Sequence, residues 1–358
     1  MTSGGQGNNP LLSVVMPVFN AEAYVAEAVE SILGQSVRNF EFIIIDDGST
    51  DNSLSILKRY AAQDTRIRLI SHENRGLVET LNEGIALARG EWIARMDADD
   101  VAMPDRFRLQ LAALEREKAD FCGGAVECFG AWRTVWSYPR THEACEVRLL
   151  FHVPFAHPTV MGRCSAFAQL RYDSRFAHAE DYDLWQRAWA RGYKLVNVPE
   201  IVLRYRVHGG QVSAIRTTEQ QDKADTVRKR HWQALSPGMD EEEIDSIIQM
   251  LRTGRGETLR LMPSLLRLLS RYSGEARETL LFDGYRAFCR LAGNDRAAAN
   301  NWISLNRYAY PGELRVSTIL RYGVLRLLST FRMRKNGALY QFLFRAQRLA
   351  FYFLKRWV

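Results

Sequence analysis

Apolar and polar residues follow two alternating patterns over the first part of the chain. Short apolar runs rich in β-branched and aromatic side chains predict buried strands. Between them, apolar residues recur every three or four positions, which predicts amphipathic helices. The strand-like runs are residues 11–16, 40–45, 67–71 and 91–94, and the helical segments are residues 22–33, 53–62 and 77–88. This alternation predicts an α/β fold, with a mostly parallel sheet and helices on both faces.

The alternation continues to about residue 205, and the pattern then becomes helical. The later elements are expected at residues 107–117 (helix), 119–124 and 132–136 (strands), from 180 onward (helix) and 196–205 (last strand). A Ser-Pro-Gly sequence at residues 236–238 marks a boundary. We therefore expect a disordered N-terminus of residues 1–10, an α/β domain of residues 11–235 and a helical region of residues 236–358.

Three carboxylates in four residues, Asp97, Asp99 and Asp100, follow the fourth strand. Such a cluster repels itself unless a cation sits among its members. Side chains two residues apart on an extended segment face the same way, so Asp97 and Asp99 can converge on one ion. Carboxylates are the ligands that Mg²⁺ and Mn²⁺ prefer. Taken alone, the segment fits a solvated acidic turn or a helix cap equally well. Asp100 is the member of the cluster that we expect to cap the following helix.

The second strand also ends in polar residues, beginning with Asp46 and Asp47. Ligands bind at this edge in open α/β sheets. No Gly-x-Gly-x-x-Gly follows a strand, and no Gly-x-x-x-x-Gly-Lys-Ser/Thr occurs. A dinucleotide-binding fold and a P-loop NTPase are therefore disfavoured.

Four ordered segments resemble the nucleotide-binding half of glycosyltransferase family 2, the inverting enzymes of the GT-A type. They read VVMPVFNAEAYVAEAVESILGQS, FEFIIIDDGSTDNS, ENRGLVETLNEGIALARGEWIARMDADD and MPDR. The resemblance covers about residues 11–213 and rests on the order and spacing of the segments. It implies a GT-A-type, Rossmann-like domain that is followed here by an α-helical C-terminal region.

The resemblance also implies roles for residues at the strand ends. The residues implied in nucleotide-sugar binding are Pro17, Val18, Phe19, Glu22, Asp47, Asp97 and Ala98. Asp99 matches the metal ligand of the family, Asp97 a second contact to the ribose or the metal, and His208 a third ligand or a phosphate contact. Mn²⁺, with Mg²⁺ tolerated, suits two carboxylates and an imidazole. Such an ion would neutralise the negative charge of a departing diphosphate.

Glu180 and Asp181 open the helix that begins near residue 180. An acceptor hydroxyl must lose a proton when it attacks a sugar donor, and a carboxylate is a suitable base. The helix dipole keeps an acid at this position ionised. The resemblance implies that Asp181 is the base; helix capping is the alternative reading. Asp183 is expected to face solvent, and His157 fits either a ligand contact or a structural role.

Composition narrows the class of protein further. Apolar residues make up 47% of the chain, which supports a sizeable core. The five cysteines form no Cys-x-x-Cys pair, which disfavours a disulfide framework and a zinc site and suits a reducing cytoplasm. The first residues show no signal-peptide pattern, and no stretch of 18 predominantly apolar residues is free of charge.

Basic residues gather at the C-terminal end. The net charge is +7, yet ten Lys and Arg and no acid follow Glu313, so residues 1–314 carry 38 basic and 41 acidic side chains. In this tail, about residues 315–358, apolar residues keep a helical spacing. Such a basic amphipathic segment favours an anionic membrane surface; packing on the catalytic domain is the alternative. Nucleic-acid binding is not expected, because no recognition motif accompanies the charge.

The sequence therefore predicts a metal-dependent inverting glycosyltransferase. The expected donor is a UDP- or dTDP-linked sugar, and the expected acceptor is a glycan or a lipid-linked molecule of cell-surface polysaccharide biosynthesis. We expect a cytoplasmic protein, peripheral on the inner face of the plasma membrane. The alternative is a non-catalytic sugar-nucleotide-binding or scaffolding protein of the same fold. A processive synthase is disfavoured because Phe353 replaces the Gln of a Gln-x-x-Arg-Trp signature.

Overall fold

The computed structural model describes residues 9–209, 218–313 and 315–330, which form two compact units. The first unit holds the chain up to Cys145 together with Val153–Ala224, and the second holds Glu146–His152 and the chain from Asp225 onward. The predicted disordered segment 1–10 lies almost wholly outside the described residues. The boundary after residue 235 stays a prediction; it falls at the end of helix α8 (Thr218–Leu235), which contributes to both units.

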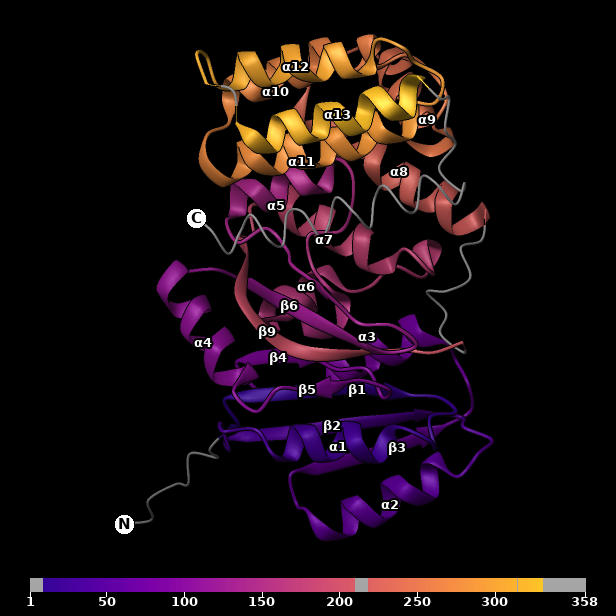
Figure 1. Cartoon of the computed structure of the whole chain (residues 1–358). Coiled ribbons are helices and arrows are strands. Elements are labelled where there is room, and N and C mark those ends of the chain that lie inside the picture. The colour runs from indigo at the N-terminus through magenta and orange to yellow at the C-terminus, as the bar shows by residue number, and fades with distance from the viewer. Residues whose placement is uncertain (1–8, 210–217, 314, 331–358) are drawn as a thin grey trace. The chain divides into compact units, whose positions relative to one another are not determined.

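A nine-stranded sheet forms the centre of the first unit (Figure 1). Its strand order is β3-β2-β1-β4-β8-β6-β9-β5, and β7 pairs with β6 outside this path. The strands are β1 (Leu12–Val18), β2 (Phe40–Asp47), β3 (Ile67–His72), β4 (Trp92–Arg95), β5 (Val101–Ala102), β6 (Phe121–Gly130), β7 (Thr134–Trp136), β8 (Met161–Arg163) and β9 (Leu195–Val207). Strands β1 to β4 are parallel, as are β6 and β9, whereas β5, β7 and β8 pair antiparallel to their neighbours. The mostly parallel sheet is confirmed.

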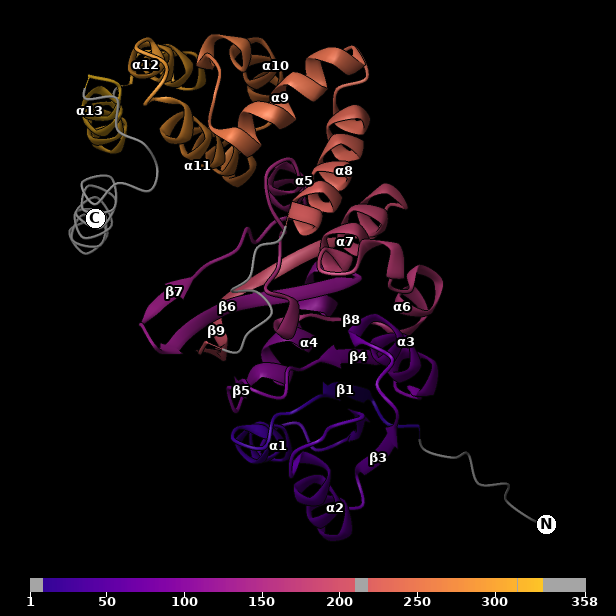
Figure 2. The same ribbon diagram turned by 90° about the vertical axis from the view of Figure 1, so that its right-hand side faces the viewer.

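Helices cover both faces of the parallel half, as Figure 2 shows. Successive side chains of a strand face opposite sides. Val14 and Met16 of β1 belong to the main hydrophobic core, whereas Val15 lies against Gly84 of α3 on the other side. The core side carries α1 (Val25–Leu33), α2 (Ser53–Gln63) and α4 (Arg106–Glu117), and the opposite side carries α3 (Leu77–Leu87). The predicted α/β layering is confirmed.

The first helix begins later than its sequence pattern suggests. α1 starts at Val25, and Tyr24 precedes it. Asn20 has a left-handed backbone (φ 50°), and its Oδ1 accepts a hydrogen bond of 2.8 Å from Thr50 N. Asn20 therefore ties the loop after β1 to the loop after β2.

Helix α7 (Glu180–Ala190) is held in place by aromatic packing within the first unit. Its Trp185 is fully buried and contacts Phe121, Phe155 and Phe167, with ring centroids 5.5, 5.0 and 6.4 Å away. Helix α6 (Cys164–Leu170) packs against α7, and α5 (His142–Leu149) comes before both in the chain. This packing fixes the first turn of α7, which carries the predicted base.

The second unit is helical, as predicted. Its helices after α8 are α9 (Glu241–Thr253), α10 (Met262–Arg271), α11 (Gly274–Leu291), α12 (Ala298–Ala309) and α13 (Val316–Thr330). Trp302 and Phe288 are fully buried in its core. Within the described residues, none of the helices has the length and apolar character needed to cross a bilayer. The part of the predicted basic tail that follows residue 330 lies outside the described residues.

Candidate active site

An acidic cluster lies where β4 ends. Asp97, Asp99 and Asp100 each offer a carboxylate oxygen, and these oxygens lie within 4.8 Å of one another. The backbone beneath them extends the sheet, because Met96 N donates to Val15 O at 3.0 Å. Sequence reasoning made Asp100 a cap of the next helix, and this is wrong. Asp100 is fully buried and accepts a hydrogen bond of 2.9 Å from Arg206 N on β9.

The end of β9 brings a histidine to this cluster. His208 Nε2 lies 3.0 Å from Asp99 Oδ2, and the His208 ring lies 4.9 Å from that of Tyr24. Arg206 donates from Nε to the carbonyl oxygen of Asp99 at 2.8 Å and pairs with Glu27 on α1. The three residues that were predicted as metal ligands, Asp97, Asp99 and His208, are thus neighbours.

Two buried arginines lie beneath the acids. Arg95 pairs with Asp97, with Nη1 2.7 Å from Oδ2, and Arg106 Nη2 donates to the carbonyl oxygen of Arg95 at 2.7 Å. Burial, followed by its neighbour Arg95, lowers the pKa of Arg106 to about 9. Burial and the carboxylates of Asp97 and Asp99 raise the pKa of Asp100 well above its usual range.

These residues fit a divalent cation. The donor set is three carboxylates and one imidazole, which suits Mn²⁺ and tolerates Mg²⁺. Asp100 Oδ2 is buried and has no hydrogen-bond partner among the described residues. Burial and the Asp99 charge also raise the pKa of Asp97, and Arg95 offsets this only in part. A cation among the three acids would relieve the repulsion.

The predicted base lies in the first turn of α7. Tyr182 N donates to Asp181 Oδ1 at 2.7 Å. Burial, and then the negative charge of Glu180, raise the pKa of Asp181 to about 7. Asp183 does not face solvent as expected: it is fully buried, and Arg187 Nε lies 2.6 Å from its Oδ2. One turn of helix separates these two residues, so Arg187 holds Asp183 inward.

The Arg95 charge links this helix to the acidic cluster. The charge of Arg95 lowers the pKa of both Glu180 and Asp181, against the larger effect of burial, and the charge of Asp97 raises the pKa of Glu180. The predicted base and the predicted metal ligands are therefore parts of one electrostatic site.

The predicted nucleotide-binding residues lie at the ends of β1, β2 and β4. Pro17 and Val18 end β1, Phe19 comes next with 52% of its surface exposed, and Ala98 is buried within the acidic segment. Glu22 accepts hydrogen bonds from Asn52, at 2.9 Å from N and 2.8 Å from Nδ2.

Asp47 is engaged with the loop before α3. It accepts hydrogen bonds from Arg75 N at 2.7 Å and Gly76 N at 3.0 Å, and His72 Nδ1 lies 3.6 Å from it. Glu22 and Asp47 thus fasten the loops around the strand ends. Both lie at the edge that was predicted to receive the nucleotide.

Sequence reasoning missed Arg95, Arg106 and Arg206 and left His157 open. His157 Nε2 lies 2.7 Å from the hydroxyl of buried Tyr172, next to Trp185. A charged residue at the end of an otherwise apolar strand is the signal that could have identified Arg95. The partners of the other residues come from distant segments, so local sequence holds no sign of them.

Comparisons with known proteins concern the family and the fold of the chain. Residues 13–171 match the family described as Glycosyl transferase family 2. An uncharacterized glycosyltransferase of Haemophilus influenzae is 33% identical over 258 residues, which cover 67% of this chain and 79% of that protein. The putative glycosyltransferase EpsE of Bacillus subtilis is 37% identical over 210 residues, which cover 56% and 74%.

A solved structure shares the fold. S. aureus TarS 1-349 in complex with UDP-GlcNAc has a TM-score of 0.55 with this chain at 15% sequence identity, and the match covers 89% of this chain and 91% of that one. At this identity the likeness concerns the fold alone.

Proposed function

This chain belongs to glycosyltransferase family 2. On that premise we propose that it transfers a sugar, with inversion, from a UDP- or dTDP-linked donor to a glycan or lipid-linked acceptor. The proposed cofactor is a divalent metal ion. The observation that carries the proposal is the convergence of Asp97, Asp99 and His208 at the strand edge beside Asp181 and Arg95. The relatives are named glycosyltransferases, which favours an enzyme over a non-catalytic sugar-nucleotide-binding protein.

The acidic cluster is the metal site of this proposal. Asp99 and Asp97 hold Mn²⁺ or Mg²⁺, and His208 completes the set. The bound ion supplies charge neutralisation for the diphosphate leaving group. Arg95 and Arg106 lie behind the acids and keep them in place.

The nucleotide occupies the edge formed by β1, β2 and β4 in this proposal. Exposed Phe19 offers an aromatic face to the base, and Pro17, Val18 and Ala98 line the surface beside it. Glu22 and Asp47 position the two loops that border the site, through the hydrogen bonds that they accept from backbone amides.

Asp181 is the base of this proposal. A carboxylate with a pKa near 7 is a stronger proton acceptor than an ordinary aspartate and is still substantially ionised at neutral pH. The proton of the acceptor hydroxyl moves to the Asp181 carboxylate as the hydroxyl oxygen attacks the anomeric carbon from the side opposite the diphosphate. One displacement of this kind inverts the anomeric centre.

A thermal-shift panel of nucleotide sugars with Mn²⁺ tests the donor and the metal. We expect UDP- or dTDP-sugars to raise the melting temperature with Mn²⁺ but not with EDTA, because only a ligand of the folded state adds stability, about 2.7 kcal/mol at a hundredfold excess over Kd. Asp99→Asn should lose the metal-dependent shift. Glu91→Gln, which removes an exposed carboxylate of the same segment, is the matched control. Equal shifts with Mn²⁺ and EDTA would contradict the metal proposal.

We also propose that the C-terminal basic segment brings the enzyme to an anionic membrane, where lipid-linked acceptors of cell-surface polysaccharide biosynthesis are presented. In α13, Val316, Ile319 and Leu327 are 60%, 47% and 42% exposed, whereas Leu325 and Leu328 are fully buried. Packing within the helical unit thus uses only part of the apolar residues of this helix. Exposed apolar side chains beside basic ones favour an anionic lipid surface.

A further inference from the structure

Three aromatic side chains form a row at the β6–β7 hairpin and the neighbouring strand β9. The ring centroids of Trp132 and Trp136 are 5.9 Å apart, and those of Trp136 and Tyr205 are 5.4 Å apart. We call these three residues the aromatic row. Strands β6, β7 and β9 lie side by side in Figure 2, and β7 pairs with β6.

The row rises from the core to the surface. Trp136 and Tyr205 are half-buried and pack against the main hydrophobic core, whereas Trp132 is 45% exposed. Packing of the hairpin on the core accounts for the first two rings. It does not account for Trp132, because an exposed indole forfeits about 25 cal/mol for each Å² of apolar surface left in water. The exposed ring is thus a candidate for ligand contact.

Hydrogen bonds fix the row close to the acidic cluster. Gly130 of β6 pairs with Val207 of β9, and Ala131 N donates to Val207 O at 3.0 Å. Trp132 comes directly after Ala131, and His208 directly after Val207. Because His208 Nε2 lies 3.0 Å from Asp99 Oδ2, the row begins at the same strand end as the acidic cluster.

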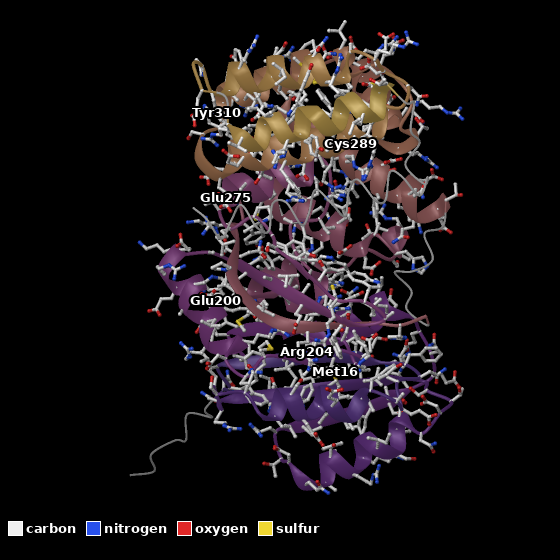
Figure 3. The ribbon with its side chains drawn as sticks, viewed as in Figure 1. Met16, Glu200, Arg204, Glu275, Cys289 and Tyr310 are labelled. Atoms are coloured by element: carbon white, nitrogen blue, oxygen red, sulfur yellow. The ribbon has the colours of Figure 1, made fainter. Side chains whose placement is uncertain are left out.

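A second set of contacts also holds the hairpin to the acidic cluster. These contacts lie on the face of β6 and β9 opposite Tyr205. The guanidinium groups of Arg204 and Arg206 lie 4.3 and 4.5 Å from the ring centre of Phe129, and Arg206 also lies 4.6 Å from that of Tyr24. Arg204 is labelled on β9 in Figure 3. Since Arg206 also donates to Asp99 O, the hairpin and the cluster are held as one body.

The row is carried by other strands than those that carry the nucleotide site. In the sheet order, β8 and β6 stand between β4 and β9, whereas the nucleotide residues lie on β1, β2 and the end of β4. A ligand on the aromatic row would therefore reach the acidic cluster along β6, β7 and β9 rather than along β1, β2 and β4. In a transfer reaction the acceptor needs such a path.

We propose that the aromatic row is a subsite for a sugar ring of a glycan acceptor, an inference that rests on the proposed function and specifies its acceptor. The face of an aromatic ring is negative and attracts the polarised C–H groups on the flat side of a pyranose, while the apolar area of both is removed from water. Several rings that extend from the core to the surface offer more contact area to an extended saccharide than to a single small acceptor. The acceptor is therefore an oligosaccharide whose non-terminal ring lies on Trp132.

Saccharide binding to the full-length protein tests the subsite without turnover. Saturation-transfer NMR and calorimetry would use di- to tetrasaccharides of glucose, galactose, rhamnose and N-acetylglucosamine as probes. We expect Trp132→Ala to weaken binding of the selected saccharide about tenfold, the size of one aromatic contact, and Trp132→Phe to restore most of it. Val135→Ala, which trims an exposed residue of the same hairpin, is the control that keeps wild-type affinity. With turnover, Trp132→Ala should raise KM for the saccharide while kcat changes little.

The outcomes separate this inference from the proposed function. Unchanged saccharide affinity in Trp132→Ala, or absence of binding of any probe to the wild type, overturns the subsite. Loss of the thermal shift produced by the nucleotide sugar in Trp132→Ala also overturns it, because the row would then belong to the donor site. If no nucleotide sugar shifts the wild type, the proposed function fails, and the saccharide titration still reports on the row by itself.

Discussion

Arg95 is a buried cation that faces carboxylates from two elements. It pairs with Asp97 at the end of β4, and its charge also acts on Glu180 and Asp181 at the start of α7. Burial and Glu180 outweigh that attraction at Asp181, whose pKa stays raised to about 7. A carboxylate with this pKa suits the proposed role of general base at neutral pH, because its basicity and its ionised fraction are both substantial there.

The raised pKa of Asp181 predicts an acid limb in the pH profile of transfer. The base must be ionised to accept a proton, so the rate should rise with pH through about 7 and level off above it. Glu180→Gln removes a negative neighbour that raises this pKa, so the limb should move to lower pH. Initial rates against pH, at saturating donor and Mn²⁺, measure both effects.

Asp181→Asn should lower kcat about 10²- to 10⁴-fold and remove the limb, the range typical of a lost general base. Asp173→Asn is the matched control, since Asp173 caps the preceding turn by accepting from Arg175 N and is not expected to carry the limb. An acid limb that persists in Asp181→Asn at its wild-type position would refute the assignment.

At the scale of elements, sequence patterns predicted most of the structure between β1 and β4 and less of the later elements. The periodicity of long segments identified their type, because apolar faces repeat over several turns or residues. Strands β5 and β8 are only two and three residues long, too short for any pattern, and both exist because a neighbouring strand pairs with them. Tertiary pairing, not local preference, decides such elements.

The residues of the candidate site also fall into those that the sequence could predict and those that it could not. Asp97, Asp99 and Asp181 could be proposed because each lies in a motif that is contiguous in sequence. Solvent exposure for Asp183 was wrong because Arg187, one turn later, holds it inward. A capping role for Asp100 was wrong because its partner Arg206 lies on a strand far along the chain. Sequence distance hides that kind of contact.

The close contact between α3 and β1 predicts that one added methyl group at Gly84 destabilises the protein. A Cβ at Gly84 would lie 2.3 Å from Val15 Cγ1, and a β-branched side chain inside a central strand has little freedom to move. Gly84→Ala should therefore destabilise the protein by about 1–3 kcal/mol. Urea denaturation followed by circular dichroism measures the change.

Gly323→Ala is the control for that substitution. Gly323 also lies inside a helix, α13, and a Cβ there would meet nothing within 4 Å. Its replacement should leave stability unchanged or raise it by up to about 1 kcal/mol through helix propensity. Equal losses in the two variants would show that the close approach of α3 to β1 is not what constrains Gly84.

At the scale of the whole molecule, charge is distributed unevenly along the chain. Residues 1–314 are close to neutral, and the excess of positive charge comes after Glu313. Helix α13 carries the first part of that excess together with exposed apolar side chains. Attraction to anionic lipid and insertion of apolar side chains would act together there.

Vesicle binding of the full chain tests the membrane proposal. We predict co-sedimentation with vesicles rich in anionic lipid, little with neutral ones, and weakening as salt rises, because salt screens the attraction. Ile319→Ser combined with Leu327→Ser should weaken binding severalfold, by removing apolar surface from the bound face. Leu259→Ser, which changes an exposed leucine elsewhere in the helical unit, should bind as the wild type does. Equal binding to neutral and anionic vesicles would argue against the proposal.

The turn between β6 and β7 has a consequence for how this enzyme can diversify. Trp132 and Arg133 lie between the Ala131–Val207 hydrogen bond and the first residue of β7, so their number can change without a shift in the β6–β9 register that sets Arg206 and His208. A one-residue slip inside β9, in contrast, would turn every side chain to the wrong face. The turn can therefore vary independently of the rest of the site. If the proposed subsite is correct, grafting turns from relatives should alter which saccharide is accepted, while the end of β9 that carries His208 stays unchanged.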